Sequence, residues 1–310
     1  MQLVLFLYAL FASVFTIAKT GLRYTEPLFF VGTRMLIAGG MMLAYQFIAH
    51  RNDFSFKKKD MWKILQLAVF NIYLCNFLEF WGLQYLTSFK TCFIYSLSPF
   101  VSALFSYLIF SEKMTPKKWL GFTVGFLGFI PILLQKSSSE KQVEHLFFLS
   151  WAELAVIGAA VSSVYGWILL RQLVKEEGYS PLMANGMSMS MGGVMALLHS
   201  YFRENWDPFP VTETIPFLGC AVLLMIISNL LAYNLYGYLL RRFTATFLSF
   251  AGFTTPLFAA LFGWFYLGEV VTPPFYLSTV IVFCGLLIFH QEELKQGYSV
   301  QPEPIEITEP

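Results

Sequence analysis

The sequence predicts an all-α integral membrane protein in which ten transmembrane helices form two inverted five-helix repeats. Composition is the first observation, because 57% of the 310 residues are hydrophobic and 13% are charged, whereas soluble domains carry about 25% charged residues. The second is a succession of ten apolar stretches, each able to cross a hydrocarbon core about 30 Å thick. The third is that the last five stretches repeat the first five. We expect helical spans, because only a helix satisfies its own backbone hydrogen bonds in lipid.

The ten expected spans lie at residues 2–18, 27–49, 61–86, 91–110, 119–135, 148–170, 181–202, 215–240, 243–267 and 274–290. The first span has no basic segment before it and no small-residue cleavage site, so we expect it to be retained. We assign residues 1–135 to the first repeat, 148–290 to the second, and the serine-containing stretch 136–147 to a linker. Residues 291–310 alternate prolines with acidic residues, which predicts a disordered cytoplasmic tail.

Basic residues indicate the orientation of the chain. Loops on the side of the two termini hold thirteen Lys and Arg, five of them in 50–63 and three in 111–118, whereas the loops on the opposite side hold six. Lys and Arg favour the cytoplasmic side of short loops. Both termini are therefore expected in the cytoplasm.

The internal repeat follows a constant offset of 157 residues in the second part of each half. This offset lays Pro99 on Pro256, Glu112 on Glu269, Thr115 on Thr272 and Gly128 on Gly285. Because each copy has an odd number of spans, the second copy enters the membrane from the opposite side. An inverted repeat of this kind is the plan of many secondary transporters, and it predicts alternating access.

Pro99 and Pro256 occupy equivalent places in the stretches LSPFVSALF and TTPLFAALF. A proline inside a helix removes one backbone hydrogen bond and bends the helix. The bend is either a static packing feature or a bend at a substrate cavity, and the symmetric placement favours the cavity.

Glu79 is the first candidate binding residue, because a charge inside a membrane span is costly and usually functional. Asn76 precedes it by three residues and shares its helix face. Glu79 either binds substrate or hydrogen-bonds a neighbouring helix. Arg34, in the second span, either extends to the membrane surface or meets a substrate carboxylate. Asn229, in the eighth span, either links helices or lines a pore.

Aromatic residues are so numerous, with 34 Phe, 16 Tyr and 7 Trp, that most must be packing or lipid-facing residues. We single out Trp81, Tyr85 and Tyr95, because they flank Glu79 or lie on the next span. A carboxylate beside aromatic faces suits an organic cation. The alternative for each of the three is ordinary packing.

No metal or cofactor site is expected. The four cysteines, Cys75, Cys92, Cys220 and Cys284, lie inside spans without a CxxC motif or a histidine at metal-ligand spacing. A Walker motif is missing, as are the HExxH, GxSxG and paired-aspartate motifs of enzymes. We therefore expect a secondary transporter of a small polar metabolite in the lipid bilayer, with no nucleic-acid partner. The sequence does not predict its oligomeric state. An intramembrane enzyme and a scaffold or receptor are the alternatives.

Residues 82–130 contain a Gly-Leu-x-Tyr-x-Thr-Ser turn, a proline within the fourth span, a glutamate that closes it and a glycine-spaced fifth span. Residues 237–288 repeat the pattern with the turn degraded. This pattern resembles the EamA-type branch of the drug/metabolite transporter superfamily. The resemblance implies ten helices, cytoplasmic termini and a central cavity shared by the halves. It leaves amino acids, sugars, nucleotide derivatives and drugs as substrate classes.

In general appearance the chain also resembles the S-adenosylmethionine transporters of obligate intracellular bacteria. This likeness implies a bacterial inner membrane and S-adenosylmethionine, exchanged for S-adenosylhomocysteine, as the expected substrates. Such a ligand combines a sulfonium, an amino-acid group and a purine. Glu79, Arg34 and the aromatic group would then bind its ammonium, its carboxylate and its flat or cationic parts.

Overall fold

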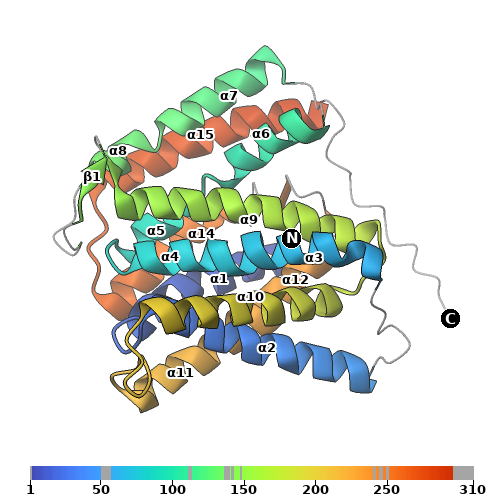
Figure 1. Cartoon of the computed structure of the whole chain (residues 1–310). Helices are drawn as coiled ribbons and strands as arrows, with labels where there is room; N and C mark the ends of the chain where they lie inside the picture. Colours follow the sequence, from blue (N-terminus) through green and yellow to red (C-terminus); the bar gives the residue numbers. More distant parts are fainter. Residues whose placement is uncertain are drawn as a thin grey trace.

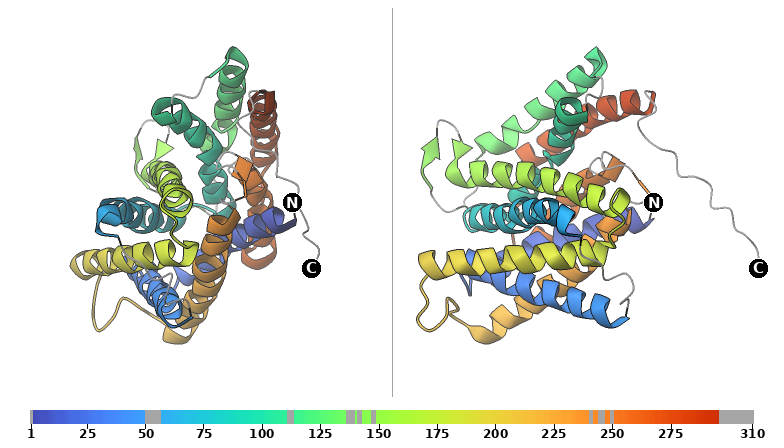
Figure 2. Two further views of the ribbon diagram at one scale, coloured as in Figure 1. Left: turned by 90° about the vertical axis from the view of Figure 1, so that its right-hand side faces the viewer. Right: turned by 45° about the vertical axis from the view of Figure 1, so that its right-hand side comes forward.

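Long helices run side by side through most of the molecule, with their loops gathered at two ends (Figure 1). The computed structural model describes residues 2–49, 57–110, 114–135, 140, 143–146, 149–239, 242–243, 247–248 and 251–295. We call the end where α1 begins the N-terminal end and the end where α1 finishes the far end. The beginning of α1 and the end of α15 lie toward the same end of the bundle (Figure 2).

The first half contains α1 (Gln2–Gly21), α2 (Pro27–Ala49), η2 (Lys58–Asp60), α3 (Met61–Leu67), η3 (Ala68–Leu74), α4 (Cys75–Leu83), α5 (Ser88–Tyr95), α6 (Ser98–Phe110), α7 (Pro116–Leu127) and α8 (Ile130–Leu134). The short strands β1 (His145–Leu146) and β2 (Leu149–Ser150) pair as a hairpin. The second half contains α9 (Trp151–Lys175), α10 (Pro181–Arg203), α11 (Thr214–Leu224), η4 (Met225–Ala232), α12 (Tyr233–Leu239), η5 (Gly252–Thr254), α14 (Thr255–Phe262), η6 (Gly263–Leu267) and α15 (Pro273–Lys295). The helix α15 thus includes residues 291–295, while residues 296–310 of the expected tail lie outside the described part.

Seven described helices are long and apolar enough to cross a membrane, against the ten spans expected from the sequence. The expected span 91–110 is two helices here, because α5 ends at Tyr95 and α6 begins at Ser98. The apolar helix Gly252–Leu267 is shorter than a full span. The helix α10 has 23 residues, but Asn185, His199 and several serines and glycines make it less apolar.

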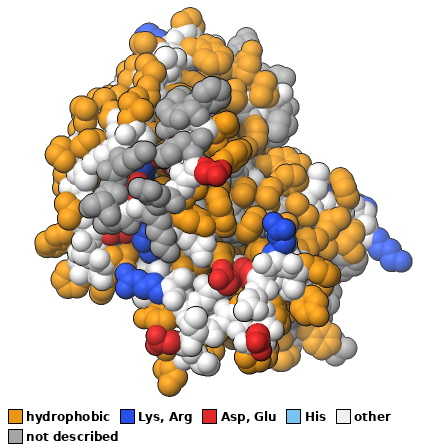
Figure 3. Space-filling view, turned by 60° about the vertical axis from the view of Figure 1, so that its left-hand side comes forward, with side chains coloured by type: hydrophobic (Ala, Val, Ile, Leu, Met, Phe, Trp, Pro, Cys, Tyr) orange, Lys and Arg blue, Asp and Glu red, His pale blue; other side chains and the backbone are white. Residues whose placement is uncertain are grey.

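The surface of the bundle is apolar, as expected for helices that face lipid. Large hydrophobic side chains such as Ile48, Phe202, Ile215 and Phe265 are mostly exposed. In Figure 3, hydrophobic side chains cover much of the visible surface, and charged groups gather in patches on the face toward the viewer. A soluble protein rarely exposes so large an apolar surface.

Glycines let α2 and α10 pack closely. A Cβ atom added at Gly39 would lie 2.6 Å from the backbone nitrogen of Ser190, and one added at Gly193 would lie 2.6 Å from that of Leu36. Small residues permit this approach of two backbones in membrane helices. The contact pairs 39–190 and 36–193 run in opposite order along the two helices, so α2 and α10 are antiparallel.

The helices α7 and α15 form a second close antiparallel pair (Figure 1). A Cβ atom at Gly285 would clash with the nitrogen of Gly125, and one at Gly128 would lie 2.9 Å from that of Val282. In both pairs, one helix comes from each half of the chain.

Two π-helical turns, η3 and η4, interrupt the third and eighth expected spans. Asn76 donates from Nδ2 to the carbonyls of Asn71 and Ile72, at 3.2 and 2.9 Å. Asn234 makes the equivalent bonds to Asn229 and Leu230, also at 3.2 and 2.9 Å. Each asparagine thereby satisfies carbonyls that the wider turn leaves free, and π-turns of this kind are frequent at functional sites.

Candidate functional site

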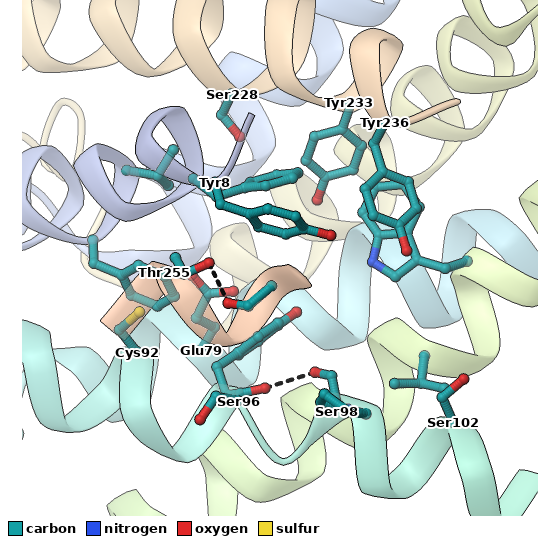
Figure 4. A pocket seen from close by; sticks show the side chains of 18 of the residues that line it. Tyr8, Glu79, Cys92, Ser96, Ser98, Ser102, Ser228, Tyr233, Tyr236 and Thr255 are labelled. Carbon is teal, nitrogen blue, oxygen red and sulfur yellow. Dashed lines mark hydrogen bonds between the residues drawn. The ribbon is translucent and has the colours of Figure 1, made fainter. Parts of the chain in front are cut away.

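A cavity lies between α1, α4, α5, α6, α9, η4, α12, η5 and α14, and it encloses about 980 Å³ including the part open to solvent. Its lining is mostly aromatic and hydroxylic (Figure 4). The aromatic lining residues are Tyr8, Phe11, Phe15, Tyr95, Trp167, Tyr233 and Tyr236, and the hydroxyl-bearing ones besides tyrosine are Ser96, Ser98, Ser102, Ser228 and Thr255.

Glu79 is the one acidic side chain among the described residues that line this cavity, and no Lys, Arg or His is among them. It lies on α4, is 8% exposed and has no hydrogen-bond or ion-pair partner within the described part of the chain. Buried charges in membrane proteins normally pair with another group. An unpaired carboxylate that faces a cavity is therefore available to a cationic ligand.

Four rings from three helices form an aromatic cluster on one side of the cavity. Trp167 lies 4.2 Å from Tyr236 and 5.0 Å from Tyr233 between ring centroids. Phe11 approaches both tyrosines edge-on at 6.3 Å. Ring faces attract organic cations and stack on flat heterocycles, so this cluster is suited to onium groups and purines.

Hydroxyl groups form the opposite side, at the break between α5 and α6 (Figure 4). Ser96 donates to the carbonyl of Phe93 at 2.5 Å, and Ser98 donates to that of Tyr95 at 2.6 Å. A hydroxyl whose hydrogen is used in this way keeps its oxygen as an acceptor. This side of the cavity therefore favours ligand groups that donate hydrogen bonds.

Four of the residues expected in the site do line the cavity: Asn76, Glu79, Tyr95 and Pro99. Pro99 is the second residue of α6, so it begins a helix after a break and does not bend a continuous one. Pro256 is the second residue of α14, which follows the 3-10 turn η5 without a gap, and it does not belong to the lining.

Trp81 and Tyr85 do not line the cavity, contrary to the expectation that they flank Glu79 within it. Their rings pack on each other at 5.2 Å. Trp81 follows Glu79 by two residues, which on a helix turns it to the opposite face. Tyr85 lies in the turn that follows α4.

Arg34 neither extends to the membrane surface nor lines the cavity. It is 2% exposed and lies behind the cavity-lining residue Asn76. There it donates to Asn76 Oδ1 at 2.6 Å and to Asn229 Oδ1 at 3.1 Å. Its guanidinium also lies over the ring of Phe80, at 4.7 Å from the centroid. Asn229 is fully buried and links helices.

Sequence reasoning missed all four rings of the aromatic cluster, and also Tyr8. Tyr8 and Phe11 are three residues apart on α1, and Tyr233 and Tyr236 are three apart on α12, so each pair shares a helix face. That spacing is a usable signal. It was hidden among 34 Phe and 16 Tyr residues, and Trp167 comes from a segment with no charge beside it.

Buried polar contacts close the far end of the bundle. Glu269 accepts hydrogen bonds from Ser88 N at 2.8 Å and Ser88 Oγ at 2.6 Å. Lys90 pairs with Glu153 at 2.9 Å and with Glu140 at 3.3 Å. We call these five residues the far-end closure. Glu112, the repeat equivalent of Glu269, lies outside the described residues.

A model of the EamA-like transporter family matches residues 1–134 and 150–290. The chain belongs to this family. As a family member it is a multi-pass membrane protein of the transporter class. The apolar surface and the internal cavity described above agree with this membership.

Two curated relatives match nearly the whole chain. The S-adenosylmethionine/S-adenosylhomocysteine transporter of Chlamydia muridarum (strain MoPn / Nigg) is 38% identical over 295 residues, covering 95% of this chain and 92% of the relative. The transporter of the same name from Chlamydia trachomatis serovar L2 is also 38% identical, over 95% and 90% of the two chains. A solved crystal structure, 15% identical, covers 95% of this chain and 96% of its own with a TM-score of 0.65, and it supports the fold.

Proposed function

We propose that this EamA-like chain is a secondary transporter that carries S-adenosylmethionine across a bacterial inner membrane in exchange for S-adenosylhomocysteine. The observation that carries the proposal is the unpaired carboxylate of Glu79 in a cavity lined mostly by rings and hydroxyls. The names of the two chlamydial relatives support the same substrates.

The chemistry of the ligand fits the lining. The ammonium of the amino-acid group needs an acceptor with negative charge, and Glu79 offers charge-assisted hydrogen bonds. The sulfonium and the purine need aromatic faces, which Trp167, Tyr233 and Tyr236 offer. The ribose hydroxyls can donate to the oxygens of Ser96 and Ser98. S-adenosylhomocysteine keeps all of these groups except the positive charge on sulfur.

The proposed mechanism is alternating access between two inverted repeats, residues 1–135 and 148–290, joined by the linker 136–147. The two family matches on residues 1–134 and 150–290 support this division. Further support comes from η3 and η4, which begin 157 residues apart. Equivalent helices also pair antiparallel, α2 with α10 and α7 with α15, as an axis in the membrane plane requires.

With both termini in the cytoplasm, the far-end closure faces the outside and the cavity extends toward the cytoplasm. Its lining includes Tyr8 near the beginning of α1 and Ile168 near the end of α9, both toward the N-terminal end. The described conformation then corresponds to a state closed to the outside. Opening of the closure would expose Glu79 to external substrate.

Glu269→Gln is expected to open the outer side more often, because it weakens the two hydrogen bonds to Ser88. In a variant whose single cysteine is Cys92, a cavity-lining residue, an impermeant thiol reagent added to intact cells should label severalfold faster after this change. Glu204→Gln is the matched control, since Glu204 also accepts bonds from a helix beginning, from Leu28 N and Phe29 N. Equal labelling in both variants would remove Glu269 from the closure, and labelling only from the cytoplasmic side would reverse the orientation.

Uptake of labelled S-adenosylmethionine by cells that express the chain tests the proposed function. We expect saturable uptake that excess unlabelled S-adenosylhomocysteine blocks. ATP should not compete, because no described lining residue carries a positive charge. Uptake no greater than in cells without the chain would contradict the proposal.

A further inference from the structure

We propose that Arg34 is a positioning residue of the substrate site. It fixes the distance between two walls of the cavity, the carboxylate wall formed by Glu79 on α4 and the aromatic wall formed by Tyr233 and Tyr236 on α12. This assigns it a role different from that of a ligand for the substrate carboxylate. The inference rests on the proposed function only in using S-adenosylmethionine as the transported probe.

Both terminal nitrogens of the Arg34 guanidinium donate to amides, while Nε has no hydrogen-bond partner among the described residues. One terminal nitrogen donates to Asn76 at 2.6 Å and the other to Asn229 at 3.1 Å. The side chain is 2% exposed and does not line the cavity. To reach the guanidinium, a substrate carboxylate would have to pass Asn76, which lines the cavity in front of Arg34.

The two partners of Arg34 belong to different halves of the chain and to the two π-turned helices. Asn76 follows η3 and is bonded to its free carbonyls. Asn229 lies within η4, and its own carbonyl accepts from Asn234. Arg34 therefore connects the third and eighth expected spans directly behind the cavity.

Each of these partners is rigidly linked to a group that faces the substrate. Glu79 follows Asn76 by three residues on the same face of α4. Tyr233 and Tyr236 follow Asn229 at the beginning of α12, and the hydroxyl of Tyr233 also accepts from Asn76 Nδ2 at 3.5 Å. A shift of either helix would change the distance between the carboxylate and the rings.

Arg34 also supplies the positive charge nearest to the site. It interacts electrostatically with Glu79 without forming an ion pair within 4 Å, because its donors are directed to the two amides. A charge in the membrane interior is tolerated where an opposite charge is near. Arg34 can thus compensate the charge of Glu79 without a hydrogen bond to it.

The second half of the chain offers a matched control. Asn185 on α10 donates to Asn234 Oδ1 at 3.1 Å, so it ties α10 to the π-turned eighth span alone, whereas Arg34 ties α2 to both π-turned spans. Neither Asn185 nor Asn234 lines the cavity. Asn185→Ala removes a buried interhelical bond of the same kind without touching the link between the walls.

The test measures KM and maximal rate of uptake for two ligands at matched membrane levels. The ligands are S-adenosylmethionine and its decarboxylated form, which lacks only the carboxylate. For Arg34→Gln we expect KM to rise about tenfold for both ligands by the same factor. Arg34→Lys, which keeps the charge but loses the planar fork, should recover part of the loss. Asn229→Ala should raise KM severalfold, and Asn185→Ala should change it less than twofold.

Three results would overturn the inference. A larger loss for S-adenosylmethionine than for its decarboxylated form would make Arg34 a carboxylate ligand. An equal loss in Asn185→Ala would mean general helix packing. An unchanged KM in Arg34→Gln and in Asn229→Ala would leave Arg34 without a role in the site.

A second measurement separates this inference from the proposed function. If the unaltered chain transports neither ligand, the proposed function fails, and the link is then tested by thermal unfolding of the purified protein. Arg34→Gln and Asn229→Ala remove the same bond, so their double variant should lose less stability than the sum of the two. Additive losses would contradict the link.

Discussion

Replacing Glu79 with glutamine is expected to lower the initial rate of S-adenosylmethionine uptake at least tenfold at matched membrane levels. A hydrogen bond to a charged group contributes about 1.5–3 kcal/mol, and about 1.4 kcal/mol corresponds to a tenfold change in affinity. Glutamine keeps the shape of the side chain and removes the charge, so the loss reports the ionic contact with the ammonium.

The control for Glu79 is the conservative variant Glu79→Asp. Aspartate keeps the charge on a shorter side chain and should retain more uptake than glutamine. The uptake rate of a ligand that lacks the amino group should differ little between the unaltered chain and Glu79→Gln. Unchanged S-adenosylmethionine uptake in Glu79→Gln would remove Glu79 from the binding site.

Replacing Trp167 with alanine is expected to raise the KM for S-adenosylmethionine about tenfold or more. Trp167 contacts both Tyr233 and Tyr236, so its loss opens the aromatic cluster. A cation over a desolvated ring gains about 2 kcal/mol or more, whereas neutral S-adenosylhomocysteine gains only stacking. The loss should therefore be greater for S-adenosylmethionine than for S-adenosylhomocysteine in competition assays.

Trp81→Ala is the matched control, because Trp81 on α4 is a tryptophan that packs on Tyr85 and does not line the cavity. We expect KM to change less than twofold in this variant. Trp167→Phe should keep most of the affinity. An equal effect of Trp81→Ala and Trp167→Ala would show that the cluster acts through packing and not through contact with the ligand.

The sequence is informative about the fold because the hydrocarbon imposes simple rules on it. Apolar length, basic loops and the repeat of Pro99 in Pro256 follow from the chain without any tertiary knowledge. The same rules miss the break at residues 96–97, since a helix that ends inside a bundle can satisfy its carbonyls through neighbours and remain equally apolar.

The sequence is less informative about the site because lining depends on which face of a helix meets which neighbour. Glu79 and Asn76 were found through their charge and polarity. Arg34 was found for the same reason, but its amide partners lie 42 and 195 residues away along the chain, beyond any local pattern. Trp167 has neither a charge nor a polar neighbour that would single it out in the sequence. Only the packing of α9 against α12 brings it to the cavity.

Exchange by the purified protein in sealed vesicles tests the central claim most directly. Vesicles preloaded with unlabelled S-adenosylhomocysteine are diluted into labelled S-adenosylmethionine, and the trapped label is followed over time. Alternating access in one shared cavity predicts faster entry into preloaded vesicles than into empty ones, and no entry into vesicles without protein. Entry at the same rate into preloaded and empty vesicles would contradict exchange, and the absence of any protein-dependent entry would contradict transport of this substrate.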